Sequence, residues 1–363
     1  MNVSRLGRAA VVAAVAAVAL SSCAANEGGS TAPSESASSL SGTINAAGAS
    51  SQGSAQEAWV AAFQTENPDV TINYDPSGSG AGREAFIAGG VDFAGSDSFL
   101  NDDELAGTFA ACAPDTKAID LPVYISPIAV IYNVEGVDEL NLDAATLAKI
   151  FKGEITTWND PAIASLNPGA TLPAANITAV HRSDDSGTTK NFADYLNQNA
   201  PEAWDQKPSD TFPYQAGEGA QGTSGVVDAV TNGVNTIGYA DASRAGDLGV
   251  ANIKVGDEFV GYTAEAAAAV VAESPLVEGR EANDLAIALD RKTTDPSHYP
   301  LVLVSYAIVC QEYADAEQGE LVKNYVGYLA SEAGQATAAE QAGSAPLSSE
   351  LADKVAAALE SVK

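Results

Sequence analysis

Residues 42–95, GTINAAGASSQGSAQEAWVAAFQTENPDVTINYDPSGSGAGREAFIAGGVDFAG, decide the fold. In this stretch, short runs typical of β-strands alternate with amphipathic segments typical of helices. We expect strands and helices in turn, strand first, over 42–47, 56–63, 70–74, 83–88 and 91–95. Such alternation predicts an α/β fold with largely parallel sheets, because parallel strands are connected through helices.

The same alternation continues to the end of the chain. Residues 119–133 form a long apolar run, which predicts one long buried strand, or a pair of strands, crossing between two lobes. Further helices are expected over 144–151, 161–166, 188–198, 225–232, 320–332 and 349–361, and further strands over 177–182, 236–240 and 300–310. The absence of a repeat with a fixed period excludes solenoids and propellers.

Length and charge exclude several classes of protein. The chain has 363 residues, which favours two globular units over one small core. It carries 17 Lys and Arg against 48 Asp and Glu, a net charge of −31. This balance argues against nucleic-acid binding, which needs clustered basic residues, and against a surface that lies on anionic lipid.

The first 22 residues are typical of a signal peptide. Arg5 and Arg8 supply its positive start, and residues 9–20 are an uncharged run of Ala, Val and Leu. This run falls short of the roughly 20 residues that a membrane-spanning helix needs. It ends in Leu20-Ser21-Ser22-Cys23, which resembles the bacterial lipobox, whose cysteine is lipidated. We therefore expect a lipoprotein signal peptide over 1–22, with a plain secretory peptide as the alternative.

A tether is expected to follow the lipidated Cys23. Residues 24–41 are rich in Ser, Ala and Gly and have no apolar period, so the segment 23–41 predicts a flexible link. It would hold the folded body near the extracytoplasmic face of the bacterial cell membrane. No later segment has 18 consecutive apolar residues, so the lipid anchor is the membrane contact that we expect.

The remaining cysteines and the histidines bear on disulfide and metal chemistry. With Cys23 assigned to the lipid anchor, two cysteines remain, Cys112 and Cys310. An even number of cysteines in an exported chain favours a disulfide, and two buried reduced thiols are the alternative. His181 and His298 are the only histidines, and no Cys or His pair has ligand spacing. We expect neither a metal site nor a cofactor.

Three segments share the order strand, small-residue loop, helix: 45–51, 75–83 and 181–189. A helix N-terminus leaves backbone N–H groups without partners and carries the positive end of the helix dipole, so it can bind an anion. Each segment alone is more often a helix cap, and none is a dinucleotide or Walker fingerprint. Three such loops, one of them with Arg182, favour convergence on an anion.

Longer motifs then point to a family. IFKGEITTWNDPAI at 150–163 runs on through LNPG at 166–169 to RSDDSGT at 182–188, and GSG at 78–80, VDFAGSD at 91–97, IGY at 237–239 and SAPL at 344–347 fit in order. Over most of 42–363 the chain resembles the substrate-binding protein of bacterial ABC phosphate importers. The resemblance implies a two-lobed type II periplasmic-binding-protein fold that clamps phosphate in the cleft between its lobes.

The resemblance also implies boundaries and contacts. Lobe 1 would comprise 42–123 plus 301–363, and lobe 2 would comprise 124–300, with a hinge near Val123 and Leu301. The implied phosphate contacts are Ser50, Ser51, Ser79 and Asp97 from lobe 1 and Arg182, Ser186, Gly187 and Thr188 from lobe 2, with Asp184 bracing the arginine. The chain departs from the family pattern at Ser51, where an aromatic residue is common, and at Asp185, which is often glycine.

The chemistry of these residues agrees with the resemblance. Arg182 can pair with phosphate through its planar fork. Phosphate near neutral pH keeps at least one O–H, which the carboxylate of Asp97 can accept, whereas sulfate has no such proton and would be rejected. The alternatives are a helix cap for Asp97 and an ordinary Asx turn for Asp184.

Other functions fit less well. A hydrolase would use Ser186 with His181 and Asp184, but Ser186 lacks a Gly-x-Ser-x-Gly elbow, and strand alternation places His181 on the face opposite Arg182. A sulfate or other oxyanion receptor and a surface adhesin remain alternatives. We expect a monomeric, non-enzymatic receptor that binds inorganic phosphate with high affinity and delivers it to the transmembrane subunits of an ABC permease.

Overall fold

The computed structural model describes residues 40–363. The expected signal peptide 1–22, the lipidated Cys23 and all but the end of the tether lie outside the described residues. Among residues 40–363 there is no helix with both the length and the apolar character that a membrane span requires.

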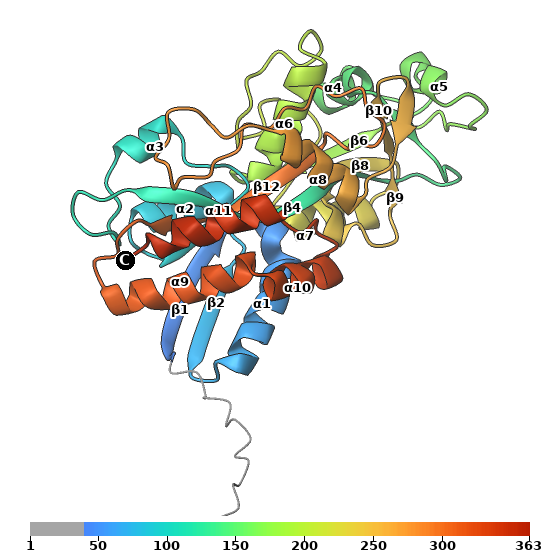
Figure 1. Ribbon diagram of the computed structural model, residues 1–363. Coiled ribbons are helices and arrows are strands. Elements are labelled where there is room, and N and C mark those ends of the chain that lie inside the picture. The colour runs from blue at the N-terminus through green and yellow to red at the C-terminus, as the bar shows by residue number, and fades with distance from the viewer. Residues whose placement is uncertain (1–39) are drawn as a thin grey trace, which may run out of the picture. The chain divides into compact units, whose positions relative to one another are not determined.

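Strands and helices alternate as the sequence predicts (Figure 1). The strands are β1 (Gly42–Gly48), β2 (Val70–Asp75), β3 (Phe93–Ser96), β4 (Ala118–Asn133), β5 (Asn141–Leu142), β6 (Thr178–Arg182), β7 (Glu218–Ala220), β8 (Thr236–Asp241), β9 (Gly249–Val250), β10 (Asn252–Val255), β11 (Glu258–Val260) and β12 (Val302–Cys310). The α-helices are α1 (Gly53–Glu66), α2 (Ser79–Ile87), α3 (Asp102–Ala106), α4 (Ala144–Lys152), α5 (Pro161–Leu166), α6 (Gly187–Asn199), α7 (Gly222–Asn232), α8 (Ala264–Glu273), α9 (Ala316–Ala330), α10 (Glu332–Ala342) and α11 (Ser349–Glu360), and the short 3-10 helices are η1 (Ser50–Gln52) and η2 (Ala242–Arg244).

The main sheet is mixed, so the expectation of largely parallel sheets is wrong in its centre. Its strand order is β2-β1-β3-β12-β4-β8-β6-β7, with β9 paired to β4. The groups β2-β1-β3 and β8-β6-β7 are parallel, whereas β12 is antiparallel to β3 and β4, and β4 is antiparallel to β8. Alternation of strand and helix detects the parallel units, but it does not give the direction of a strand that enters the sheet after a long connection.

One strand runs through both halves of this sheet. β4 is a single element of 16 residues, all buried except its last, which confirms the prediction of a long buried strand. Up to Pro127 it pairs with β12, and from Ile128 onward it pairs with β8. The predicted lobe boundary falls at Val123, and the change of partner lies four residues after it.

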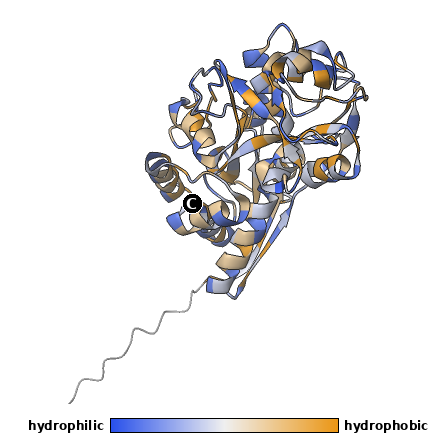
Figure 2. Ribbon diagram, turned by 90° about the vertical axis from the view of Figure 1, so that its right-hand side faces the viewer, coloured by the Kyte–Doolittle hydropathy of each residue, from blue (hydrophilic) through white to orange (hydrophobic). Residues whose placement is uncertain are grey.

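The C-terminal helices complete the N-terminal half. α9 packs on β1 and α10 packs on α1, although they are far apart in the sequence (Figure 1). The helix predicted over 320–332 is α9, which ends two residues earlier, and α10 was not predicted. The chain turns at Ser331, whose hydroxyl caps α10 by accepting from the Gly334 N–H at 3.1 Å. Most helices carry both apolar and polar residues (Figure 2). In α4, for example, the apolar residues Leu147, Ile150 and Phe151 are buried.

A disulfide joins Cys112 to Cys310, which are 198 positions apart in sequence and have their Cα atoms 5.3 Å apart. This resolves the alternative between a disulfide and two reduced thiols. Because Cys310 ends β12, the bond fixes the loop after α3 to the central strand.

Candidate functional site

The predicted loops meet where the parallel strands end. Ala47 of β1 pairs with Asp75 of β2, and Gly48 pairs with Gly95 of β3, so the carboxyl ends of the three strands share one edge. In open α/β sheets this edge is where ligands bind. Asp97 follows β3 directly and lies at the centre of the cluster.

Hydroxyl groups from both predicted lobes contact Asp97. Ser51 Oγ donates to Asp97 Oδ1 at 2.6 Å, and Thr188 Oγ1 donates to Oδ2 at 3.0 Å. Ser79 Oγ accepts from the Asp97 backbone N–H at 3.1 Å. The structure therefore brings together predicted residues that are up to 137 positions apart in sequence.

A further donor, Ser305 of β12, was not predicted from the sequence. Its Oγ donates to Asp97 Oδ1 at 2.6 Å. The available signal was a hydroxyl in the middle of the apolar run 300–310. Asp97 is only 4 % exposed. Burial raises its pKa, and the hydrogen bonds from Ser305, Ser51 and Thr188, with the charge of Arg182, act in the opposite direction.

Glycines allow the loop before α2, in predicted lobe 1, and the loop before α6, in predicted lobe 2, to approach each other. A Cβ on Gly187, the first residue of α6, would lie 2.6 Å from Asp97 Cβ and 2.7 Å from Ser79 Oγ. A Cβ on Gly78 would lie 2.6 Å from Asp184 Oδ2, and Gly78 also has a φ of +111°, which L side chains rarely adopt. The loops before α2 and α6 are thus packed directly against each other.

Arg182 is held by Asp184, as the resemblance implies. The arginine Nε donates to Asp184 Oδ1 at 2.8 Å, and Nη2 pairs with Oδ2. The Gly222 N–H also donates to Asp184 Oδ1, at 3.0 Å. Burial acts to raise the pKa of Asp184, but the Arg182 hydrogen bonds and charge outweigh it and hold the pKa below its ordinary value. Within residues 40–363, Nη1 of Arg182 makes no hydrogen bond and can donate to an anion.

Two predicted residues have other partners. The Ser50 Oγ lies 3.0 Å from Thr223 Oγ1 and accepts from the Thr223 N–H at 3.0 Å, so its hydroxyl is not among those on Asp97. Ser186 caps α6, because its Oγ accepts from the Thr189 N–H at 3.2 Å. Thr223 was not predicted, although it follows a glycine and lies two residues before the predicted helix 225–232.

Backbone donors surround the same cluster. The residues before η1 and α2, Ala49 and Gly78, form no side-chain cap. The first N–H groups of a helix have no partner within it, so those of Ser51, Ser79 and Gly187 are directed outward from helix starts. Neutral and cationic donors thus surround one buried carboxylate.

Ion pairs and hydrogen bonds beside this cluster join predicted lobe 1 to Asp210 of predicted lobe 2. Arg83 of α2 pairs with Asp210 at 2.7 Å and with Glu104 at 2.9 Å. Ser98 Oγ donates to the other oxygen of Asp210 at 2.7 Å, and the Asp210 backbone carbonyl accepts from the Ser186 N–H at 2.9 Å. Burial opposes ionisation of Asp210, but the charges of Arg83 and Lys190 hold its pKa below the ordinary value.

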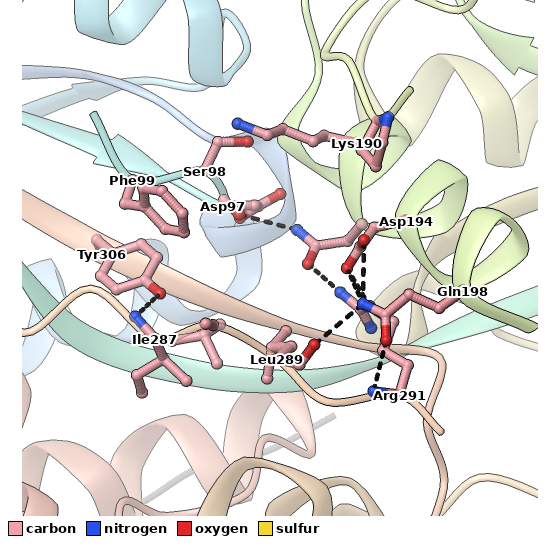
Figure 3. A pocket seen from close by; sticks show the side chains of 14 residues that line it. Asp97, Ser98, Phe99, Lys190, Asp194, Gln198, Ile287, Leu289, Arg291 and Tyr306 are labelled. Atoms are coloured by element: carbon pink, nitrogen blue, oxygen red, sulfur yellow. Dashed lines mark hydrogen bonds and ion pairs between the residues drawn. The ribbon is translucent and has the colours of Figure 1, made fainter. Parts of the chain in front are cut away.

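Behind Asp97 lies a separate pocket of about 250 Å³ (Figure 3). Its walls include Phe99, Leu289 and Tyr306, and among the predicted contacts only Asp97 lines it. Asn191 donates to the Asp97 backbone carbonyl at 2.8 Å and accepts from the buried Arg291. These contacts support the loop that carries Asp97.

The residues of the hydrolase alternative are not arranged for catalysis. The His181 ring stacks on Phe212 with centroids 3.8 Å apart, and its Nδ1 lies 2.9 Å from the Arg182 carbonyl. The hydroxyl of Ser186 faces the Thr189 N–H instead. Among residues 40–363 no group of three His, Cys, Asp or Glu side chains could hold a metal ion.

Fold and site together define a periplasmic-type binding protein, and a PBP superfamily domain matches residues 33–333. Phosphate-binding protein PstS 3 of Mycobacterium tuberculosis is 39% identical over 339 residues, 90% of each chain. PstS 2 of the same organism is 35% identical in an alignment of 376 positions that covers the whole of both chains. PstS of Haemophilus influenzae is 28% identical over 79% of this chain and 83% of its own. The chain belongs to the PstS family of phosphate-binding proteins.

Solved structures agree with the fold. A high-affinity periplasmic phosphate-binding protein bound with phosphate superposes with a TM-score of 0.70 at 24% identity, covering 87% of this chain and 93% of its own. A human phosphate binding apolipoprotein gives a TM-score of 0.68 at 24% identity, with coverages of 86% and 93%. The predicted type II periplasmic-binding-protein fold and the predicted family are confirmed.

Proposed function

We propose that this protein binds inorganic phosphate outside the cytoplasm and delivers it to the transmembrane subunits of an ABC permease. Proteins of its family are binding proteins and not enzymes. The observation that carries the proposal is the buried carboxylate of Asp97 at the centre of a donor-rich cluster, in a chain related to phosphate-binding proteins over most of its length.

The cluster supplies the donors that a phosphate needs. Arg182 contributes a charge-assisted hydrogen bond through Nη1, while Asp184 occupies its other edge and keeps the fork oriented. The helix starts contribute backbone N–H groups at low cost, since these groups have no partner within the helix. The proposed contacts are Ser50, Ser51, Ser79, Asp97, Arg182, Ser186, Gly187 and Thr188.

Asp97 gives the preference for phosphate over other oxyanions. A phosphate O–H donates to the carboxylate, whereas sulfate would place a charged oxygen with lone pairs against it. Because Asp97 is buried, solvent and salt do not screen this repulsion. Affinity for an anion in a chain of net charge −31 must come from such short-range, desolvated contacts.

Binding is proposed to close two lobes, comprising 42–123 plus 301–363 and 124–300. Contacts to phosphate come from both sides, so only the closed state forms all of them. The change of partner in β4 supports a hinge beside the predicted Val123 and Leu301, because the Ile128 N–H donates to the Leu301 carbonyl at 2.8 Å. Residues 280–288, assigned to lobe 2, also contact the first half, since the Leu285 N–H donates to the Asp120 carbonyl at 2.9 Å.

The membrane attachment is proposed from sequence alone. A lipidated Cys23 followed by an 18-residue tether rich in Ser, Ala and Gly would allow the monomer an r.m.s. reach of roughly 23–25 Å from the membrane. Cys23→Ala should release the protein from the membrane fraction into the medium, while phosphate binding is unchanged. Retention of Cys23→Ala in the membrane would contradict the anchor.

Equilibrium dialysis with radiolabelled phosphate tests the function itself. The purified protein should retain one phosphate per chain, and Arg182→Ala should lose most of this binding. Cells that lack the protein should take up phosphate again when the native gene is restored, but not when the Arg182→Ala form is supplied. Native protein that retains no phosphate would overturn the proposal.

A further inference from the structure

A chain of buried side chains leads from the C-terminal helix α9 to Asp97. Tyr325 Oη donates to Gln56 Oε1 at 2.8 Å, and Gln56 Nε2 donates to Gln52 Oε1 at 2.8 Å. Gln52 Nε2 donates to Ser305 Oγ at 2.7 Å, and Ser305 Oγ donates to Asp97 Oδ1 at 2.6 Å. None of the five side chains is more than 4 % exposed.

The direction of this chain is fixed at Gln52. Its Nε2 also donates to the backbone carbonyl of Tyr306 at 3.2 Å. A carbonyl oxygen can only accept, so the amide must place its NH₂ group there and its oxygen toward Gln56. The opposite amide orientation would bring two acceptors together at Tyr306 and two donors together at Gln56.

The fixed amide in turn orients the hydroxyl of Ser305. An amide NH₂ cannot accept, so Ser305 Oγ must use a lone pair toward Gln52, and its own hydrogen is directed to Asp97. The same Asp97 oxygen also receives the Ser51 hydroxyl. A proton on that oxygen would meet two hydrogens already in place, so this arrangement favours the ionised carboxylate.

This orientation opposes the effect of burial. Desolvation raises the pKa of Asp97, and the hydrogen bond from Ser305 comes first among the contacts that lower it. A protonated Asp97 would donate to the ligand instead of accepting from it. It would then no longer distinguish an oxyanion with a proton from one without.

We propose that Gln52, Gln56, Ser305 and Tyr325 form a positioning relay that keeps Asp97 a hydrogen-bond acceptor and so sets the preference for a protonated oxyanion. The inference rests on the proposed function for its consequence in binding. The relay itself is a property of the ligand-free protein. Its residues act through Asp97 and are not among the proposed phosphate contacts.

The pKa of Asp97 can be measured without phosphate, from the carboxyl carbon resonance in a pH titration, assigned with Asp97→Asn. Ser305→Ala should raise this pKa by about one unit, the size expected for one hydrogen bond to a charged group. Gln52→Met should raise it by less, and Tyr325→Phe, which removes one oxygen atom at the far end, should raise it least. Tyr328→Phe is the matched control, because its hydroxyl lies on the same helix but faces Thr337 at 3.3 Å.

Competition between phosphate and sulfate gives the second readout. The ratio of sulfate affinity to phosphate affinity should rise in the order Tyr325→Phe, Gln52→Met, Ser305→Ala, by up to about tenfold for one pKa unit. Loss of thermal stability alone would not move either readout.

The relay is overturned if Ser305→Ala and Tyr325→Phe leave the Asp97 pKa at its native value, or if Tyr328→Phe moves it as far as Tyr325→Phe does. If Gln52→Met does not fold, the Asp97 pKa in Ser305→Ala and Tyr325→Phe, the two ends of the relay, still tests the proposal. A native protein that binds no phosphate would overturn the proposed function, while the order of the pKa values would still test the relay.

Discussion

Gly187→Ala tests whether the contact between the two sides belongs to the phosphate-bound state. The new methyl group would lie 2.6 Å from Asp97 Cβ and 2.7 Å from Ser79 Oγ. Both distances are about 0.7 to 0.8 Å short of the 3.4 Å at which ordinary contact begins. Overpacking of this kind costs about 1–3 kcal/mol, so the Kd for phosphate should rise about 5- to 150-fold at 25 °C.

The cost arises only in the closed state, in which the loops before α2 and α6 are in contact. The unliganded protein, with its lobes open, should therefore keep its free energy of unfolding. Gly225→Ala in α7 is the matched control, since its Cβ would meet its nearest atoms at 3.7 Å. Neither glycine has a positive φ, so the comparison contains no backbone strain. Isothermal titration and thermal unfolding of both variants provide the measurement. Phosphate binding by Gly187→Ala within about twofold of native, a change of under 0.5 kcal/mol, would mean that the two loops are not in contact in the phosphate-bound protein.

Three further predictions concern the arginine, a buried acid and the disulfide. Arg182→Ala should weaken phosphate binding by about 3–5 kcal/mol in titration calorimetry, because it leaves Asp184 without its partner as well as removing a ligand donor; a near-native Kd would mean that Arg182 does not contact the ligand. Burial raises the pKa of Asp241 to about 6 from 3.8, so the folded state binds this proton more tightly and stability falls as the pH rises through that interval. Asp241→Asn should therefore add about 3 kcal/mol to the free energy of unfolding above pH 6 and little near pH 4, and an equal gain in denaturant melts at both values would contradict this. Removing the bond between Cys112 and Cys310, which spans 198 residues, should lower the free energy of unfolding by about 5 kcal/mol on the loop-closure estimate, and an unchanged Tm in reductant would oppose it.

The fold could be predicted from sequence where local patterns determine it. Alternation of strand and helix located β1, α1 and β2, and the unbroken apolar run located β4 as one element. Strand direction was the part that failed. The direction of β12 depends on its pairing with β3 and β4, more than 160 residues away in sequence, and no local pattern records such a pairing.

The site, too, could be predicted from sequence only where a local pattern marks it. Loops of Gly and Ser before helices are local signals, and they predicted an anion site, whereas Ser79, Ser186 and Gly187 as its contacts came from the family resemblance. Ser305 was missed because a hydroxyl within an apolar strand resembles a tolerated core residue until its partner is known. Asp210 was missed because its role depends on Arg83 of another segment, 127 residues away.

A buried, ionised Asp97 is proposed to select an oxyanion that carries a proton. Titration calorimetry of the native protein with phosphate and with sulfate, at one pH and ionic strength, tests this most directly. We expect tight binding of one phosphate per chain and no measurable sulfate binding, and a smaller difference between the two affinities in Asp97→Asn. Equal competition by sulfate in the native protein would contradict it.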